Sequence, residues 1–428
     1  MKNTLIPALR GTRDFYPEDM RKRRSLLNSL RKTIELYGYD EYDAPLLESF
    51  DLYAAKSSPE IIERQSYVFE DRGGDRIVVR PEMTPSIARM VAAKQRELPS
   101  VLRWYSFPEC WRYERPQKGR LRNFLQANID LIGSDSIEAD VEIIDLALSM
   151  VRDLGIDMSK IEVRINDRRL LEGWLADAGI TRENQTNALS LLDEKDKLEP
   201  DVFRTRLIEF SSPESADALI QKLTLSPEAL RTDEKAARLY ETQKQLVKLG
   251  WRDNVKIDAT IIRGFTYYTG IVFEVYEISG QFQRAIFGGG RYDGLVEALG
   301  GSPVSAIGFG VSDVSLEELL LTQNKTLENA EDKAVMLIPF SDAEAQEQSR
   351  IAKLLRTNGI ITATSFPPYG FSSQLKLAQK RNIETVILLA PEELKANNVI
   401  VRNLKTGLQE VIAIASLLDY CKQLTNTD

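Results

Sequence analysis

Apolar and polar residues alternate with different periods along this chain, and the changes in period divide it into parts. Residues 18–37 place apolar side chains at three- and four-residue spacing up to Gly38, which predicts an amphipathic helix. Residues 139–155 repeat that spacing and predict a second helix. Between the two, short apolar runs joined by Gly- and Pro-containing turns predict strands, for example RIVVR, VLRWYSF and LQANIDLIG.

The pattern changes again in the second half of the chain. From about 168 to 250 glycine is scarce and the period is helical throughout, which predicts a helical insertion. Strand-like runs and glycines return at 255–312. Residues 1–325 are therefore expected to form an α+β main domain that carries the insertion.

A polar run, QNKTLENAEDK, follows this domain, and we place a linker within it at residues 326–332. Beyond the linker, strand-like AVMLIPF, IITATSF and TVILLA alternate with helical segments. That alternation predicts a small parallel or mixed α/β domain over residues 333–428.

Composition narrows the class of protein. The 428 residues are 43% hydrophobic and 28% charged, as in ordinary globular proteins with two or three domains. No apolar run approaches the ~20 residues that cross a bilayer, and the N-terminal apolar stretch is too short for a signal peptide. We expect a cytoplasmic protein that does not bind membranes.

The residues available for chemistry are restricted. Cys110 and Cys421 have no CxxC partner, so two reduced, packed thiols are expected rather than a zinc site or a disulfide framework. The chain contains no histidine, which excludes imidazole bases, His-activated nucleophiles and His metal ligands. No protein-bound metal is expected, and chemistry must use carboxylates, cations, hydroxyls, backbone and the substrate.

The net charge of −8 does not by itself suggest a polyanionic partner. Residues 333–428 carry 11 Lys and Arg against 9 Asp and Glu, a net of +2, so residues 1–332 carry −10. A nucleic acid would therefore bind local patches. One candidate lies on a predicted helix that carries Lys376, Lys380 and Arg381.

VVRPEMT (78–84) is the first stretch with candidate chemistry. It predicts a strand ending in Arg-Pro-Glu, with Glu82 and Thr84 on the same side of an extended segment. A carboxylate beside a hydroxyl suits an ammonium group. An ordinary surface strand end fits these residues equally well.

The second stretch is WRYERPQKGRLRNFLQANID (111–130), with five cations in its first twelve positions. A solvated charged face is the simplest explanation of a basic cluster. Here, however, Arg112 and Glu114 alternate as on one side of a strand, and a loop and a returning strand follow. Such a hairpin could grip a triphosphate while Phe124 faces a purine. Further along, the shared face of Gln126 and Asp130 could hold a small polar ligand.

The last two stretches are rich in glycine. RGFTYYTG (263–270) combines a cation with two tyrosines between glycines, which suggests close approach of the backbone to a ligand. Core packing of both tyrosines is the alternative, and on a strand the two would point in opposite directions. FGGGRYDGL (287–295) has three glycines that strand propensity does not explain, and it lacks the GxxxxGK[ST] order of a Walker loop.

Together these stretches resemble the histidyl-tRNA synthetases, a family of class II aminoacyl-tRNA synthetases. The resemblance runs from RGTRDFYP (10–17) through RPEMT, RYERPQKGRLRNF and Gln126 to RGFTYYTG and GGRYDGL. It implies a class II antiparallel-sheet catalytic domain with a helical insertion, followed by an α/β anticodon-binding domain. It also implies histidine activation with ATP and Mg²⁺, transfer to tRNA(His), and a homodimer built by a first motif around residues 42–56.

The resemblance also implies roles for single residues. Arg263 and Arg112 would be the catalytic residues at the α-phosphate of ATP. Glu114 and Phe124 would lie on the adenine side, and Arg120 at the outer phosphates. Mg²⁺ would bridge the phosphates. The residues that would bind histidine are Glu82, Thr84 and Gln126 at its amino end, with Asp130, Tyr267, Tyr268 and Tyr292 around the rest. Attack by the substrate's own carboxylate needs alignment and charge neutralisation, so a chain without histidine can perform it.

The sequence departs from the family pattern at several positions. Ser315 stands where the third motif usually has an ATP-gripping arginine, Thr266 stands for an Asp, and Asp130 replaces the usual Glu. Positions where relatives often carry histidine hold Tyr113, Leu125 and Asp167.

The alternative function is that of a related non-catalytic protein, the synthetase-like regulatory subunit of ATP phosphoribosyltransferase. That paralogue generally lacks the C-terminal domain and degrades the RGxxYYTG stretch, and both are present here. The sequence therefore favours the synthetase.

Overall fold

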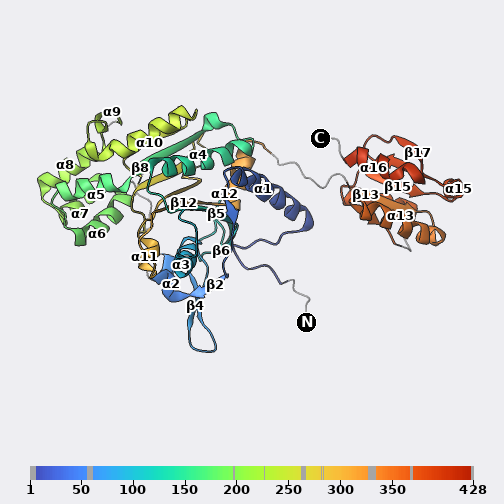
Figure 1. The fold of residues 1–428 in the computed structure, drawn as a ribbon, viewed down its shortest axis with the longest axis horizontal. Helices are drawn as coiled ribbons and strands as arrows, with labels where there is room; N and C mark the ends of the chain where they lie inside the picture. The colour runs from blue at the N-terminus through green and yellow to red at the C-terminus, as the bar shows by residue number, and fades with distance from the viewer. Residues whose placement is uncertain are drawn as a thin grey trace. The chain divides into compact units, whose positions relative to one another are not determined.

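The structure is a computed structural model of the whole chain (Figure 1). It describes residues 6–54, 61–195, 198–225, 227–261, 267–280, 282, 284–325, 334–366 and 370–425. The expected linker at 326–332, Arg263 and Thr266 lie outside these residues, as do positions 55 and 56 of the predicted first motif.

The chain divides into two compact units. One contains residues 1–16 and 26–327, and the other contains residues 17–25 and 328–428. Helix α1 (Pro17–Leu36) agrees closely with the helix predicted at 18–37, and its Leu26, Leu30 and Ile34 are buried in the core of the first unit.

The first unit is built on one large sheet, which has nine strands in the described part of the chain. Their order is β1 (Asp40–Glu41), β5 (Leu102–Ser106), β7 (Asn123–Ile132), β12 (Ala306–Ser312), β11 (Phe287–Arg291), β10 (Ile271–Glu277), β8 (Ile161–Asp167) and β9 (Val255–Ile257), with β6 (Glu109–Trp111) paired to β7. The central strands are antiparallel, whereas β1–β5 and β8–β9 are parallel. The predicted α+β class is confirmed.

The two faces of this sheet bury different clusters because strand side chains alternate. Ala127, Ile129 and Leu131 of β7 join the large core with α4 (Ile137–Asp153), on which Ile143, Ile144 and their neighbours are buried. Helix α12 (Asp313–Thr322) also contacts β7 and β12. The opposite face packs against α3 (Thr84–Lys94) and α11 (Leu295–Ala298).

A smaller sheet has the strand order β2 (Leu47–Ser49), β4 (Arg76–Val79), β3 (Tyr67–Glu70). Along the chain, α2 (Phe50–Ala54) follows β2, and a π-helical turn (Ile61–Gln65) precedes β3. β4 ends at Val79 and Thr84 already begins α3, so the expected extended segment over 78–84 is wrong. Pro81 has no backbone N–H with which to continue the strand, and the buried Arg80 guanidinium before it donates to the carbonyl oxygens of Ala44 and Glu109.

Between β8 and β9 the chain is helical, and these helices gather at one end of the sheet (Figure 1). Ser212 caps one of them by accepting a hydrogen bond from the Ser215 amide at 3.1 Å, and Pro200 and Pro213 occupy first helical turns. The helices are α5 (Arg168–Asp177), α6 (Arg182–Asp193), α7 (Pro200–Ile208), α8 (Pro213–Leu223), α9 (Pro227–Leu230) and α10 (Ala237–Lys248).

The second unit has a five-stranded sheet in the order β14 (Thr362–Thr364), β13 (Val335–Pro339), β15 (Thr385–Leu389), β16 (Asn398–Asn403), β17 (Gln409–Ala413). The first three strands are parallel, as the strand–helix alternation predicts, and the antiparallel β16–β17 pair was not predicted. Its helices are α13 (Ala345–Thr357), α14 (Phe371–Lys380), α15 (Pro391–Lys395) and α16 (Leu417–Thr425).

Within the ranges that the structure describes, no helix has the length and apolar character needed to span a bilayer.

Candidate active site

Strand β7 places three polar side chains on the face of the large sheet opposite the main core. Gln126, Asn128 and Asp130 alternate with the core residues of the same strand. The Gln126 amide donates to Asn128 Oδ1 at 2.5 Å. The predicted shared face of Gln126 and Asp130 is therefore present, and Asn128 completes it.

Glycines on the neighbouring strands leave room beside these side chains. Gly308 pairs with Asp130 and Gly310 with Asn128 across β12 and β7. A Cβ at Gly308 would lie 2.3 Å from Asp130 Oδ1, and one at Gly310 would lie 2.2 Å from Gln126 Nε2. On the other side, Gly288 and Gly290 of β11 pair with Gly310 and Gly308. The glycine run therefore serves close packing around polar groups.

A cavity of about 110 Å³, here called the tyrosine cavity, opens over this surface. That volume is somewhat smaller than the roughly 150 Å³ of a protein cavity that binds benzene. It is lined by Glu82, Thr84, Arg112, Gln126, Asn128, Tyr267, Tyr268, Gly288, Tyr292, Gly308, Phe309 and Gly310. Seven residues singled out from the sequence thus lie around one space of ring size.

The two adjacent tyrosines both contribute to this cavity. Their ring centroids are 5.0 Å apart, and the Tyr267 hydroxyl donates to Glu82 Oε2 at 2.9 Å. Tyr267 and Tyr268 do not lie in a strand, so the opposite orientation expected of adjacent strand residues does not apply to them. Glu82 and the double tyrosine, which are far apart in the sequence, therefore meet in this cavity.

Asp130 is the buried acid of this region. Its side chain is almost fully buried, and Oδ1 accepts a hydrogen bond from the Tyr292 hydroxyl at 2.6 Å. Burial raises the pKa of Asp130 to about 7, although the hydrogen bond from Tyr292 lowers it. Among the described residues no hydrogen bond of ordinary geometry reaches its Oδ2, although Asn128 and Tyr42 lie near enough to the carboxyl to lower its pKa as well. Asp130 is not among the residues that line the tyrosine cavity, but a buried acceptor of this kind favours a ligand that brings an N–H donor.

A second cavity of about 300 Å³, here called the arginine cavity, is lined by Arg64, Gln65, Tyr113, Glu114, Arg115, Gln117 and Arg120. It contains two predicted site residues, Glu114 and Arg120, which form an ion pair at 3.3 Å. Because Arg112 lines the tyrosine cavity while Tyr113 and Glu114 line this one, consecutive residues connect the two. Three guanidinium groups suit a polyphosphate.

The hairpin itself is partly as predicted. β6 pairs with β7, but β6 ends at Trp111, so the strand expected for Arg112 and Glu114 is absent. Arg112 is positioned instead by hydrogen bonds from its Nε to the Pro81 carbonyl at 2.9 Å and from its backbone N–H to the Arg122 carbonyl at 2.8 Å. The Arg112 guanidinium is therefore held in place from a loop and not from a strand.

Phe124 and Ser315 line neither of the two cavities in the described residues. Phe124 is buried with the Arg112 guanidinium 5.4 Å from its ring centroid. Ser315 lies in the first turn of α12, where its N–H donates to Ser312 Oγ at 3.1 Å. Arg13 binds the flanking Asp313 and Glu317 at 2.8 and 2.6 Å.

Sequence reasoning missed several residues of these cavities. Asn128 could have been found, because it shares the two-residue period of Gln126 and Asp130. The alternating glycines of AIGFGVS were a weaker signal. Arg64 had none, because only the tertiary structure brings it beside Arg115.

Comparison with known proteins agrees with these features. The family model described as histidyl-tRNA synthetase matches residues 11–316, and the anticodon-binding domain model matches residues 334–424. A histidine–tRNA ligase of Leptospira biflexa is 36% identical over 97% of each chain.

Solved structures share the fold. The histidyl-tRNA synthetase of Nostoc sp. PCC 7120 has a TM-score of 0.79 at 22% identity, covering 99% of this chain and 100% of that one. A Bacillus halodurans structure titled as an ATP phosphoribosyltransferase regulatory subunit/histidyl-tRNA synthetase has a TM-score of 0.73 at 24% identity, covering 91% of this chain and 99% of that one. The class II catalytic domain and the α/β anticodon-binding domain expected from the sequence are thereby confirmed, and this chain belongs to the histidyl-tRNA synthetase family.

Proposed function

We propose that this chain is an active histidine–tRNA ligase, which condenses histidine with ATP and transfers the histidyl group to tRNA(His). The observation that supports this most directly is the tyrosine cavity, where seven residues predicted from separate stretches meet, beside the arginine cavity. Family membership supports the same activity and its use of ATP.

In the proposed first step, a carboxylate oxygen of histidine attacks the α-phosphorus of ATP. A new O–P bond forms, the bond to the bridging oxygen breaks, and pyrophosphate leaves. Arg112 would stabilise the charge that develops on the α-phosphate, and Arg263 would act with it. Glu82 and Gln126 would hold the ammonium group, with Thr84 beside them, so that the carboxylate faces the phosphorus.

The imidazole would lie among the tyrosines, with Asp130 behind the residues that line the tyrosine cavity. Oδ2 of Asp130 would accept an imidazole N–H, and Tyr292 would hold the carboxylate in place. Tyr267 and Tyr268 would cover the ring. Amino acids without a ring N–H would leave the buried acid unpaired, which is a strong source of rejection.

ATP would extend from Arg112 into the arginine cavity. Glu114 and Phe124 would lie on its adenine side and Arg120 at its outer phosphates. With Ser315 in the place of the third-motif arginine, we infer that Arg64 or Arg115 supplies the missing cation, since both line the arginine cavity. Mg²⁺ would be held by the phosphate oxygens of ATP, because the carboxylate among the residues that line the arginine cavity, Glu114, is paired with Arg120.

The proposed domains are a catalytic domain of residues 1–325 with its insertion at about 168–250, a linker at 326–332 and an anticodon-binding domain at 333–428. In the last, Lys376, Lys380 and Arg381 are exposed at the end of α14, where they could contact tRNA phosphates. Two reduced cysteines agree with a cytoplasmic protein.

We also propose a homodimer formed through the first motif around residues 42–56. The support is a set of exposed apolar side chains in and beside β2 and β3: Leu46, Leu47, Val68 and Phe69. Sedimentation analysis would distinguish a dimer from a monomer.

Histidine-dependent exchange of labelled pyrophosphate into ATP tests the activity. Exchange should require histidine and no other amino acid, and Arg112→Gln should lower kcat more than it raises KM for histidine. A folded protein that binds histidine without exchange would favour the regulatory-subunit alternative. A folded protein that neither exchanges nor binds histidine would contradict the whole assignment.

A further inference from the structure

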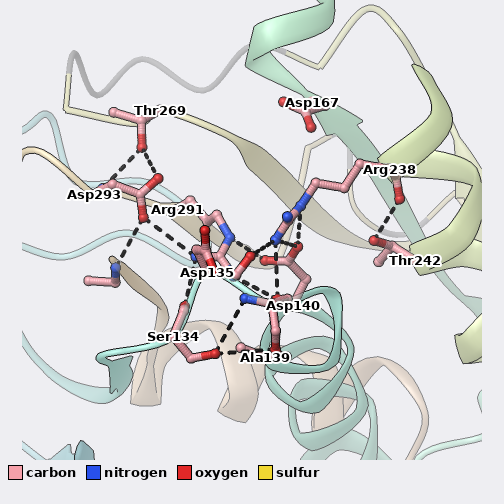
Figure 2. Close-up of polar contacts among 12 residues, drawn as sticks. Ser134, Asp135, Ala139, Asp140, Asp167, Arg238, Thr242, Thr269, Arg291 and Asp293 are labelled. Carbon is pink, nitrogen blue, oxygen red and sulfur yellow. Dashed lines mark hydrogen bonds and ion pairs between the residues drawn. The ribbon is translucent and has the colours of Figure 1, made fainter. Parts of the chain in front are cut away.

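A network of buried ion pairs adjoins the residues that line the tyrosine cavity, and none of its members has a role in the proposed reaction. At its centre is Asp140, in the first turn of α4, whose side chain is fully buried. Figure 2 shows two arginines that approach it from two sides. Arg291 Nε lies 2.5 Å from Oδ1, and Arg238 donates to Oδ2 from Nε at 2.9 Å and Nη2 at 2.6 Å.

Arg291 connects this network to the cavity. It is the arginine of GGGRYD, it is buried, and it directly precedes Tyr292. Its guanidinium also donates to the carbonyl oxygens of Ser134 and Ser136 at 3.0 and 2.9 Å. The position of the Tyr292 backbone therefore depends on an arginine whose donors are committed to the start of α4.

The segment after the double tyrosine is tied to the same place. The Thr269 N–H donates to the Arg291 carbonyl at 2.8 Å, and the Thr269 hydroxyl donates to Asp293 Oδ2 at 3.1 Å (Figure 2). A Cβ at Gly270 would lie 3.1 Å from Arg291 Cδ, so the backbone packs directly on this side chain. Tyr268 and Tyr292, which line the cavity, are thus each one residue from a member of the network.

The other arginine comes from the helical insertion. Arg238 is the second residue of α10, the last helix of the insertion, and it also donates to the Asp135 carbonyl at 2.6 Å. At the other end of the insertion, Arg169 of α5 donates to Asp167 at 2.9 and 2.6 Å. The start of the insertion therefore brings an arginine to Asp167, which pairs with Ile271 next to Gly270, and its end brings one to Asp140, which binds Arg291 of β11.

We propose that Arg238 is a positioning residue for histidine binding, through which the docked insertion sets the shape of the tyrosine cavity by way of Asp140 and Arg291. Loss of Arg238 leaves the buried Asp140 with one of its two cations, and Asp140 and Arg291 would then shift together. Because Gly270 packs on the Arg291 side chain and the Thr269 N–H donates to the Arg291 carbonyl, that shift would reach Tyr292 and the Thr269 segment. This inference rests on the proposed histidine-binding function of that cavity.

The test compares Arg238→Gln with Arg238→Lys and with Arg204→Gln. Arg204 is a matched control, because it makes a bidentate ion pair with Asp217 at 2.6 and 2.8 Å inside the insertion, in a more exposed position. Pyrophosphate exchange gives KM for histidine and for ATP, and titration calorimetry gives the histidine Kd directly.

Arg238→Gln should raise KM and Kd for histidine between about threefold and thirtyfold, the range of coupling through such networks, with KM for ATP within about twofold of the wild type. Arg238→Lys should restore part of the affinity, and Arg204→Gln should change neither constant. If Arg238→Gln does not fold, Arg238→Lys must still weaken histidine and spare ATP.

Unchanged histidine constants in the folded Arg238 variants, or equal loss for histidine and ATP, would overturn the inference. So would a fall in kcat and thermal stability with both KM values unchanged, because that is the result of a purely structural anchor. Wild-type protein without histidine-dependent exchange would instead contradict the proposed function, so the two failures are distinguishable.

Discussion

Replacement of Asp130 by Asn should make the unliganded protein increasingly stable relative to the wild type as pH rises, while it weakens histidine binding. The native pKa of Asp130 is about 7, raised by burial from 3.8. Between these values the native protein binds more protons at this site than the unfolded chain does. The free energy of unfolding of the wild type therefore falls as pH rises through this window, and it stays low above pH 7. Asn does not ionise, so the variant lacks this contribution to the pH dependence of stability.

The size of the effect follows from the two pKa values. A difference of about three units corresponds to about 4 kcal/mol across the whole window, at about 1.4 kcal/mol per unit. Part of that change is complete by pH 5, because the unfolded carboxyl is mostly ionised there. Between pH 5 and pH 8, the stability of Asp130→Asn relative to the wild type should therefore increase by about 2 to 3 kcal/mol.

Urea titrations of both proteins at several pH values, followed by tryptophan fluorescence, measure this difference. All four tryptophans lie between residues 26 and 327, so the signal reports the unit that contains Asp130. Asp253→Asn removes the same charge at an exposed position, and its difference from the wild type should stay within about 0.5 kcal/mol at every pH. A pH-independent difference for Asp130→Asn would refute the idea that burial keeps this acid protonated near neutrality.

Three further predictions test the site and the second unit. Gly308→Ala places a Cβ 2.3 Å from Asp130 Oδ1, so it should lower the free energy of unfolding by about 1 to 3 kcal/mol and raise KM for histidine. Gly294→Ala, with open space around it, should change the free energy of unfolding little. Equal shifts of the melting temperature in the two variants would contradict this. Arg64→Gln should raise KM for ATP about tenfold and leave KM for histidine unchanged, as loss of one charge-assisted hydrogen bond requires; an unchanged KM for ATP would remove Arg64 from the ATP site. Lys376, Lys380 and Arg381 should contact tRNA phosphates. A variant with all three changed to Gln should lower the slope of log affinity for tRNA against log salt concentration by about 2 to 3, whereas Lys395→Gln should not change it. An unchanged slope in the triple variant would show that the phosphate contacts lie elsewhere.

Local periodicity was sufficient for much of the fold. The helices near 18–37 and 139–155 and the alternation of the second unit follow from spacing alone, because side-chain direction repeats every 3.6 residues in a helix and every two in a strand. The shared face of Gln126 and Asp130 follows for the same reason. The candidate residues themselves came from the family resemblance together with these patterns.

Pairing partners and burial were beyond the reach of local pattern. Arg112 lies outside a strand, where its N–H donates to the Arg122 carbonyl and its side chain to the Pro81 carbonyl, and the double tyrosine also lies outside the strands. A strand exists only where a neighbour accepts its hydrogen bonds, and the local pattern does not show which neighbour that is.

By itself, then, the amino-acid order determined which segments are helical or extended and which residue types were available for chemistry without histidine. Only the tertiary structure decided which of them meet. It brought Tyr267 to Glu82 across 185 positions, and it placed Arg64 in the arginine cavity and Arg238 on Asp140. It also raised the pKa of Asp130, because desolvation depends on what surrounds a group in space and not on its neighbours along the chain.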